Sequence, residues 1–495
     1  MKEIQTSKSN KILNLLIIII LFLAFKLLSI DINKPFWGHH DWNSVVYSNI
    51  ARNYIRYGYI KTKFGQVTNH DSQSNNKFGY ITHYPPLLPI IISISFKLAG
   101  QSETSARLPI VLFSLLMIYC IYQIGKEIHS KLLGFFAASS AMFLSIFLYF
   151  GKLPVHDTII PPISVFGFWI YIKLIKENKV KYFYLLVTSL IIGGLINWSA
   201  FYLTVALICH QFIYKTSKDI KYKIYTLLPI SVTLFLLHIV HIKILGQKST
   251  NAFSNLMERI NPFLTADLYG YTPVKYVVQE LRFTKIYYTL PVLLGAIIFI
   301  FLFAYYFKKN RIDLAKSIII VLFLYGIIQL VVFQQLSFIH DYMIYYMLPF
   351  MVLSFAYSVF FIINSLKKKL IFPLILILLL ALILFSQFKY TQTLLATNIN
   401  KRGYDVARVI NTNTTSGQVS FIASNSYKEF QEVFIGYYSD RNVSYGDELP
   451  SNFDKTITLI VRPKDHDPLP IESKKLLDDI YPKYENDKFI WYKIK

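Results

Sequence analysis

The dominant pattern along the chain is a series of apolar runs separated by short polar segments. Nine runs are long enough to cross about 30 Å of hydrocarbon. They lie near 12–30, 106–124, 132–150, 159–175, 224–245, 287–307, 317–335, 342–363 and 370–387. A tenth apolar stretch, 183–214, is interrupted by Asn197-Trp198-Ser199 and predicts two short helices that meet at the outer face. The pattern predicts about eleven membrane crossings. No small-residue cleavage site follows the first run, so we expect a retained helix rather than a signal peptide.

Lys and Arg are concentrated in alternate connecting segments. Twenty of them, with five Asp and Glu, occupy six segments: 1–11, 125–131, 173–182, 215–223, 308–316 and 367–369. Basic residues confined to alternate short loops indicate the cytoplasmic side. This predicts a multi-pass protein of the cell membrane with a cytoplasmic N-terminus and an extracytoplasmic C-terminus. The net charge of +23 is explained by these loops, and nucleic acid is not an expected partner.

Composition supports a membrane protein. Hydrophobic residues make up 54% of the 495 residues and charged residues 16%, where a soluble chain carries about a quarter charged residues. The two cysteines, Cys120 and Cys209, both lie in apolar runs, so no disulfide framework or cysteine metal site is expected.

Three polar segments are predicted on the outer side: a first loop (31–105), a second loop (246–286) and a tail (388–495). The tail alternates strand-like runs at Val419–Ala423, Thr456–Val461 and Lys488–Ile494 with helix-like runs near 426–435 and 471–480. This predicts a transmembrane domain over 1–387 and a soluble α/β domain over 388–495.

The first loop shows two further elements. Apolar residues recur at helical spacing over Trp42–Tyr59, with Gly58 as the expected stop. Pro85-Pro86 opens an apolar stretch that Gly100 closes. This stretch is too short to span the membrane comfortably and predicts an interfacial helix.

Asp41 is the first candidate for chemistry. It follows His39 and His40 shortly after the first apolar run. A carboxylate there is able to deprotonate an acceptor hydroxyl at the lipid surface, and the imidazoles are able to bind metal or phosphate. An acidic residue at a membrane surface also needs no function, and both histidines fit solvated positions equally well.

Other candidates share the predicted outer face with Asp41. Ser102 or Thr104 is expected to cap a helix whose first turn holds Glu103, which is a structural alternative to a role in a pocket. Arg107, at the start of a span, needs a partner. The remaining candidates are His83, Lys152, His156, Asp157, His340 and Tyr345. With Arg52 and Arg259 they form a set of carboxylates, imidazoles and cations suited to a charged headgroup at the outer leaflet.

Taken in order, these pieces resemble the GT-C membrane glycosyltransferases, in the branch of the protein O-mannosyltransferases and the lipid A aminoarabinose transferase. The matching pieces are Asp41, Tyr47–Arg52, His83–Leu87, Gly100–Glu103, Arg107–Pro109, His156-Asp157, His340–Tyr342 with Pro349, and Tyr437–Arg441. The resemblance covers residues 12–215 well and rests on the last two pieces beyond that.

The resemblance implies a sugar transfer from a polyprenyl phosphate, or a dolichyl phosphate, to a hydroxyl of a lipid, glycan or protein at the outer face, with inversion. Asp41 is then the catalytic base and Asp157 the second acidic residue. The implied donor and phosphate ligands are Arg52, Arg107, Lys152, Arg259 and His340. The implied pocket residues are His83, Glu103, His156 and Tyr345.

The chain also departs from this family. Trp42 stands where many relatives have a second acidic residue, and Tyr84 precedes Pro85-Pro86 where the aminoarabinose branch has Lys. No cofactor is certain, although His39, His40 and His83 are candidate ligands for a divalent ion. Two other functions remain open: a transporter or flippase of a lipid-linked glycan, which the charge-free span centres disfavour, and a membrane anchor for the tail domain.

Overall fold

The computed structural model describes residues 2–70, 78–247, 249–265, 267, 270–365, 372–396 and 400–494. The basic segment 367–369 therefore lies outside the described residues. The chain divides into two compact units. The first, here the helical unit, comprises 1–33, 82–88 and 107–394, and the second, here the mixed unit, comprises 34–81, 89–106 and 395–495.

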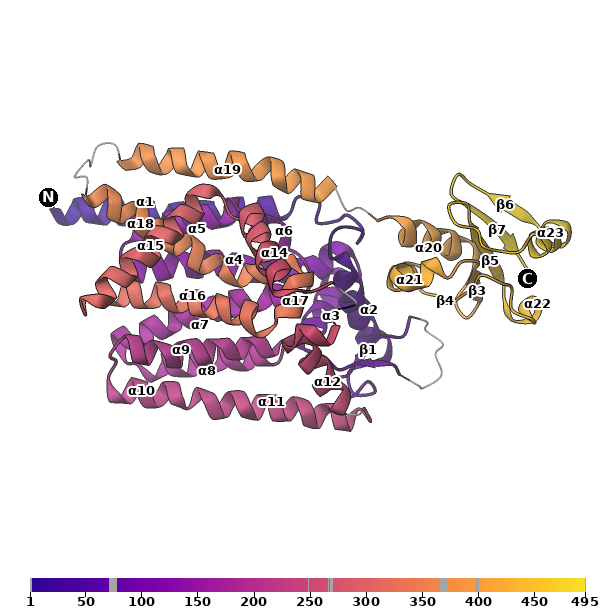
Figure 1. Cartoon of the computed structure of the whole chain (residues 1–495), viewed down its shortest axis with the longest axis horizontal. Helices are drawn as coiled ribbons and strands as arrows, with labels where there is room; N and C mark the ends of the chain where they lie inside the picture. Colours follow the sequence, from indigo (N-terminus) through magenta and orange to yellow (C-terminus); the bar gives the residue numbers. More distant parts are fainter. Residues whose placement is uncertain are drawn as a thin grey trace. The chain divides into compact units, whose positions relative to one another are not determined.

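The helical unit is built from long apolar helices that run side by side (Figure 1). In chain order it contains α1 (Lys2–Leu28), most of α4 (Glu103–Ile128), α5 (Lys131–Phe143), α6 (Ser145–Phe150), α7 (His156–Glu177), α8 (Val180–Gly194), η1 (Trp198–Phe201) and α9 (Tyr202–Ile213). It continues with α10 (Lys218–Tyr225), α11 (Leu227–Ile244), α12 (Ser249–Ile260), η2 (Pro262–Thr265), α14 (Pro273–Tyr287) and α15 (Leu290–Lys308). It ends with α16 (Leu314–Val332), α17 (Gln334–Ile339), η3 (Asp341–Met347), α18 (Leu348–Ser365) and α19 (Phe372–Ala396).

Seven of the described helices are long and apolar enough to cross a membrane. They are Glu103–Ile128, His156–Glu177, Lys218–Ile244, Leu290–Lys308, Leu314–Val332, Asp341–Ser365 and Pro373–Ala396. The other predicted crossings correspond to shorter apolar helices at Leu15–Leu28, Lys131–Phe143, Val180–Gly194 and Trp198–Ile213. The polytopic helical fold is confirmed, whereas the total of eleven crossings and their orientation stay predictions.

Two glycines allow α4 and α5 to approach closely. A Cβ atom at Gly125 would lie 2.4 Å from the Cα of Gly134, and one at Gly134 would lie 2.2 Å from the carbonyl oxygen of Tyr122. No real Cβ tolerates such distances. Backbone contact at small residues is a common way for membrane helices to pack, because lipid supplies no hydrophobic drive between them.

The mixed unit begins with elements of the loop 31–105. Helix α2 (Asp41–Tyr57) ends at Gly58, whose φ of 82° suits glycine. Helix α3 (Leu87–Ala99) lies partly in this unit and ends at Gly100, with φ 80°. Strands β1 (Gln66–Val67) and β2 (Tyr80–Ile81) pair antiparallel. Both helices lie where the apolar spacing predicts them.

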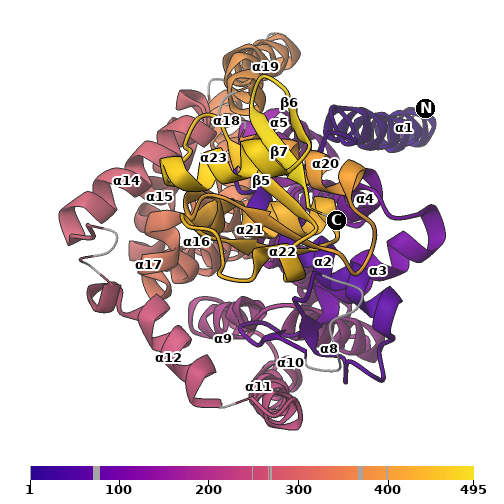
Figure 2. The same cartoon turned by 90° about the vertical axis from the view of Figure 1, so that its right-hand side faces the viewer.

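The tail forms a five-stranded mixed sheet in the order β4-β3-β5-β7-β6. Figure 2 labels β5, β6 and β7 of this sheet together with the helices of the tail. The strands are β3 (Val419–Ile422), β4 (Asn442–Tyr445), β5 (Leu459–Pro463), β6 (Lys483–Glu485) and β7 (Phe489–Lys493). Strand β3 pairs in parallel with β4 and β5, and β7 pairs antiparallel with β5 and β6. The predicted α/β tail is confirmed, with β4 and β6 as additions.

Helices cover both faces of this sheet. Helices α20 (Arg402–Asn413) and α21 (Ser426–Ser439) pack on one core, which includes Ile410, Ile435 and Val461. Helices α22 (Phe453–Thr456) and α23 (Ile471–Ile480) pack on the other core, which includes Leu477 and Tyr492. Each face therefore buries its own hydrophobic cluster, which is the usual way to stabilise a sheet of this kind.

Candidate active site

Asp157 is held at the start of a membrane helix. It lies in the first turn of α7, where the positive end of the helix favours a carboxylate. Its Oδ1 accepts hydrogen bonds from the Asn197 amide at 2.8 Å and from the Tyr346 hydroxyl at 3.0 Å. The Ser199 and Tyr346 hydroxyls lie 2.6 Å apart. Asp157 is 2% exposed, so these bonds fix the orientation of its carboxylate.

A cation approaches the same site from the loop 246–286. Arg259, in the last turn of α12, donates from Nη1 to the Tyr84 hydroxyl at 2.6 Å. Its guanidinium also lies 5.0 Å from the centre of the Tyr84 ring. The Tyr84 ring also stacks on His156, with ring centres 4.6 Å apart. The predicted residues His156 and Arg259 are thus brought together through Tyr84.

His83, Asp157 and Arg259 line one cavity, together with Asn197, Gln329 and other residues of α12, α16 and α17. Burial, and to a lesser degree Arg259, lower the pKa of His83 to about 4, so its imidazole is neutral at physiological pH. Its buried Nδ1 has no hydrogen-bond partner among the described residues. The free space is about 20 Å³, about that of one water molecule, so a sugar ring enters only if the lining side chains move.

Arg107 and Lys152 both bind the backbone that follows α1. Arg107 Nη1 donates to the carbonyl oxygen of Ile32 at 2.9 Å, and Lys152 Nζ donates to the carbonyl oxygen of Ile30. Both side chains are buried. The partner that Arg107 was expected to need therefore includes a backbone carbonyl, and the proposed contact of these two cations with phosphate stays a prediction.

Asp41 belongs to the mixed unit. It is the first residue of α2 and follows His40, whose φ is 62°. Its carboxylate accepts hydrogen bonds from the Gly38 backbone and the Ser44 hydroxyl, both at 2.9 Å. These bonds orient Asp41, which is 6% exposed. Asp41 and Asp157 belong to different units, and their joint action in one site stays a prediction.

Arg52 contacts the tail domain within the mixed unit. Its Nη1 donates to the Tyr437 carbonyl at 2.8 Å, its guanidinium lies 4.9 Å from the Tyr437 ring centre, and it forms an ion pair with Asp440 at 3.3 Å. Arg56 adds two hydrogen bonds to Asp440 at 2.8 and 2.6 Å. Arg52 therefore links α2 to the tail, and its role in binding the donor stays a prediction.

Glu103 is also joined to the tail. It begins α4, and the preceding Ser102 caps this helix by accepting from the Ser105 backbone at 3.1 Å. The predicted cap is therefore present. The Glu103 carboxylate accepts a hydrogen bond from Tyr438 at 2.9 Å. The helix start and the hydrogen bond from Tyr438 thus give Glu103 a structural role, and its place in a substrate pocket stays a prediction.

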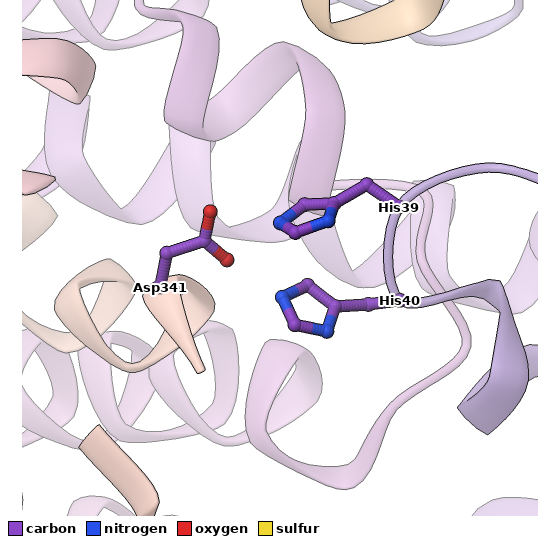
Figure 3. A group of neighbouring side chains, drawn as sticks. All are labelled: His39, His40 and Asp341. Atoms are coloured by element: carbon purple, nitrogen blue, oxygen red, sulfur yellow. The ribbon is translucent and has the colours of Figure 1, made fainter. Parts of the chain in front are cut away.

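The three histidines predicted as metal ligands are divided between the two units. His39 and His40 lie in the mixed unit, with ring centres 3.9 Å apart, and His83 lies in the helical unit. Figure 3 draws the two adjacent imidazoles together with Asp341, a residue of the helical unit. Imidazole is a common ligand of divalent transition metals, and a metal on His39 and His40 stays a prediction.

The last two predicted residues lie at η3. The His340 ring stacks on Tyr342, with ring centres 5.0 Å apart, and Tyr345 is fully buried. Tyr345 was the residue predicted from the sequence, whereas the next residue, Tyr346, binds Asp157. Tyr84, Asn197 and Ser199 were not predicted as site residues. The polar interruption at 197–199 was the signal for two of them, although it was interpreted only as a helix break.

Comparison with known proteins relates part of the chain to a family of mannosyltransferases. Residues 83–242 match the family model described as dolichyl-phosphate-mannose-protein mannosyltransferase, and this range includes His83, Asp157 and Asn197. No curated protein matches the sequence.

Three solved structures share the fold at low sequence identity. ArnT from Cupriavidus metallidurans matches in the apo state with 11% identity and a TM-score of 0.56, over 97% of both chains. Its complex with undecaprenyl phosphate matches with 10% identity and a TM-score of 0.58, over 97% of this chain and 98% of that one. The oligosaccharyltransferase AglB from Archaeoglobus fulgidus, solved with an inhibitory peptide and a dolichol-phosphate, matches with 13% identity and a TM-score of 0.57, over 97% of this chain and 74% of that one.

The family match includes the cavity residues His83, Asp157 and Asn197 but ends before Arg259. The structural matches extend over nearly the whole chain. The family resemblance and the helical fold with its α/β tail, both expected from the sequence, are therefore confirmed. Residues 83–242 therefore match the dolichyl-phosphate-mannose-protein mannosyltransferase family, and the chain as a whole has the fold of the membrane enzymes ArnT and AglB.

Proposed function

We propose that the chain transfers a sugar from a polyprenyl-phosphate donor to a hydroxyl of a lipid, glycan or protein acceptor at the extracytoplasmic face. The observation that supports this most is the cavity that is lined by both a cation, Arg259, and an oriented carboxylate, Asp157. Asp157 lies inside the family-matched residues 83–242, and Arg259 lies shortly after them. Transfer of a glycosyl group from phosphate needs both kinds of group, because negative charge develops on the leaving phosphate while the sugar carbon becomes electron-poor.

Each residue receives a role from its chemistry. Arg259 neutralises the phosphate that leaves, and its planar guanidinium suits phosphate oxygens. Asp157, held by Asn197 and Tyr346, stabilises positive charge on the sugar or orients its hydroxyls. Asp41 acts as the general base that removes the proton of the acceptor hydroxyl.

The proposed reaction is a single displacement. The acceptor oxygen attacks the anomeric carbon, the bond from that carbon to the phosphate oxygen breaks, and the acceptor proton passes to Asp41. One displacement inverts the anomeric configuration. The products are the glycosylated acceptor and the polyprenyl phosphate.

The test compares purified wild type with Asp41→Asn in the transfer of labelled sugar from polyprenyl phosphate to an extract of membrane lipids and envelope proteins. A general base contributes about 10²- to 10⁴-fold, so we expect a loss in this range, with unchanged thermal stability and helix content. The product of the wild type should carry the inverted configuration. Equal transfer by both proteins would remove Asp41 from the mechanism, and a retained configuration would exclude a single displacement.

A further inference from the structure

A large apolar groove lies on the helical unit, apart from the residues of the candidate active site. It measures about 1000 Å³ and is lined by the end of α14 and by α15, α18 and α19. Its long part is apolar, with Leu294, Ile298, Val359 and Leu382 in the lining. Helices α15, α18 and α19 belong to segments long enough to span a membrane, so this part of the groove faces hydrocarbon.

One end of the groove is polar and positively charged. Arg282 and Lys285, three residues apart on α14, lie on the same side of the helix and both line the groove. Both side chains are exposed. They directly precede the membrane helix α15, so they stand where a lipid headgroup meets water.

A buried hydroxyl lies at the same end. Thr289 lines the groove, is 5% exposed, and its Oγ1 has no hydrogen-bond partner among the described residues. It precedes the first residue of α15 without capping that helix through its side chain. A buried polar atom without a partner costs free energy, and a ligand oxygen placed here would supply the missing bond. Two cations, this hydroxyl and the positive start of α15 together suit a phosphate.

We propose that this groove binds an anionic glycerophospholipid of the surrounding bilayer, with its phosphate at Arg282, Lys285 and Thr289 and its acyl chains along α15, α18 and α19. The lining contains no acidic residue as far as the structure describes it. A glycosyl donor needs a carboxylate beside its reacting carbon, so this groove suits a lipid that is bound but does not react. The absence of negative charge also favours an anionic headgroup over a zwitterionic one.

The test measures lipid bound to the full-length protein by native mass spectrometry in detergent, with phosphatidylglycerol, phosphatidylcholine and a polyprenyl phosphate as probes. Wild type should retain phosphatidylglycerol in preference to phosphatidylcholine. Since a basic residue near an anionic headgroup contributes about a fivefold effect, the double variant Arg282→Gln/Lys285→Gln should bind phosphatidylglycerol about 10- to 30-fold more weakly.

Two further variants distinguish lipid binding in the groove from a general effect of positive charge on lipid binding. Lys243→Gln/Lys275→Gln removes two exposed cations outside the groove and should bind phosphatidylglycerol as wild type does. Leu382→Trp fills the apolar part and should reduce binding without any change of charge. Equal retention of both phospholipids by wild type, or equal loss in the two charge variants, would overturn the proposal.

Competition distinguishes this inference from the proposed function. If polyprenyl phosphate displaces phosphatidylglycerol from wild type and itself binds the Arg282→Gln/Lys285→Gln variant more weakly than wild type, the groove holds the polyprenyl lipid and the proposed occupant is wrong. Phospholipid binding is measured without sugar transfer. A failure of the proposed function therefore appears as absent transfer and leaves this result unchanged.

Discussion

Replacing Arg259 by Gln should weaken the binding of the donor by an amount that can be estimated from its contacts. In the proposed reaction Arg259 leaves its contact with the Tyr84 hydroxyl, at 2.6 Å, and binds the donor phosphate instead. A hydrogen bond to a charged group contributes about 1.5–3 kcal/mol. At about 1.4 kcal/mol for each factor of ten, the loss of this bond should raise the donor KM about 10- to 150-fold.

The assay is a donor titration with purified protein, in which kcat and KM are measured separately. Arg259→Lys keeps the charge but loses the planar, two-pronged donor, so it should fall between wild type and Arg259→Gln. Tyr84→Phe removes the hydroxyl that Arg259 contacts but keeps the aromatic ring. We expect this variant to remain within a few-fold of wild type.

Two results would refute this reasoning. An unchanged donor KM in Arg259→Gln would show that Arg259 does not bind the phosphate. A loss in Tyr84→Phe as large as that in Arg259→Gln would show that Arg259 acts by holding Tyr84 in place. Thermal unfolding of each variant serves as the control, since a misfolded protein would lose activity without information on the site.

Three other predictions concern stability. Burial, with a smaller effect of Asp341, raises the pKa of Glu280 to about 8. Between pH 5 and 8 the folded state therefore holds a proton that the unfolded state has lost. The free energy of unfolding of the wild type should then fall by at most about 1.4 kcal/mol per pH unit in this range. Thermal melts at several pH values should show a smaller slope for Glu280→Gln. Gly134→Ala places a methyl group against the Tyr122 carbonyl and should cost about 1–3 kcal/mol, seen as a lower unfolding temperature. Asp440→Asn breaks the ion pair with Arg56 and should make the tail more sensitive to limited proteolysis.

Each of these predictions has a clear contrary outcome. A wild-type melting temperature that does not change with pH would mean that Glu280 titrates normally. Wild-type stability in Gly134→Ala would contradict the close approach of α4 and α5. An Asp440→Asn tail as resistant to protease as wild type would show that its contacts with α2 do not depend on this ion pair.

Local patterns in the sequence were sufficient for most of the fold. Helices α2 and α3 were predicted from apolar spacing, and their ends from Gly58 and Gly100, because positive φ values at these positions favour glycine. Strands β3, β5 and β7 were predicted from short apolar runs. The partly exposed strand β4 was missed, since its residues form no buried run.

The site was less predictable because its contacts join residues far apart in the chain. Asn197 and Tyr346 meet at Asp157 across 40 and 189 positions, and no periodicity encodes such a meeting. Tyr346 rather than Tyr345 binds Asp157 because the 3₁₀ segment η3 sets which side of the chain each residue occupies. Arg52 pairs with Asp440 in the tail, a contact that the local sequence near Arg52 does not reveal.

The measurement that tests the central claim most directly is sugar transfer by the wild-type protein in sealed vesicles, with a panel of polyprenyl-phosphate sugars and an envelope extract as acceptor. The account predicts that at least one labelled sugar moves to an acceptor and that polyprenyl phosphate is released in equal amount. Movement of the intact donor lipid across the bilayer, with no sugar transferred from any donor, would contradict the account and favour a flippase.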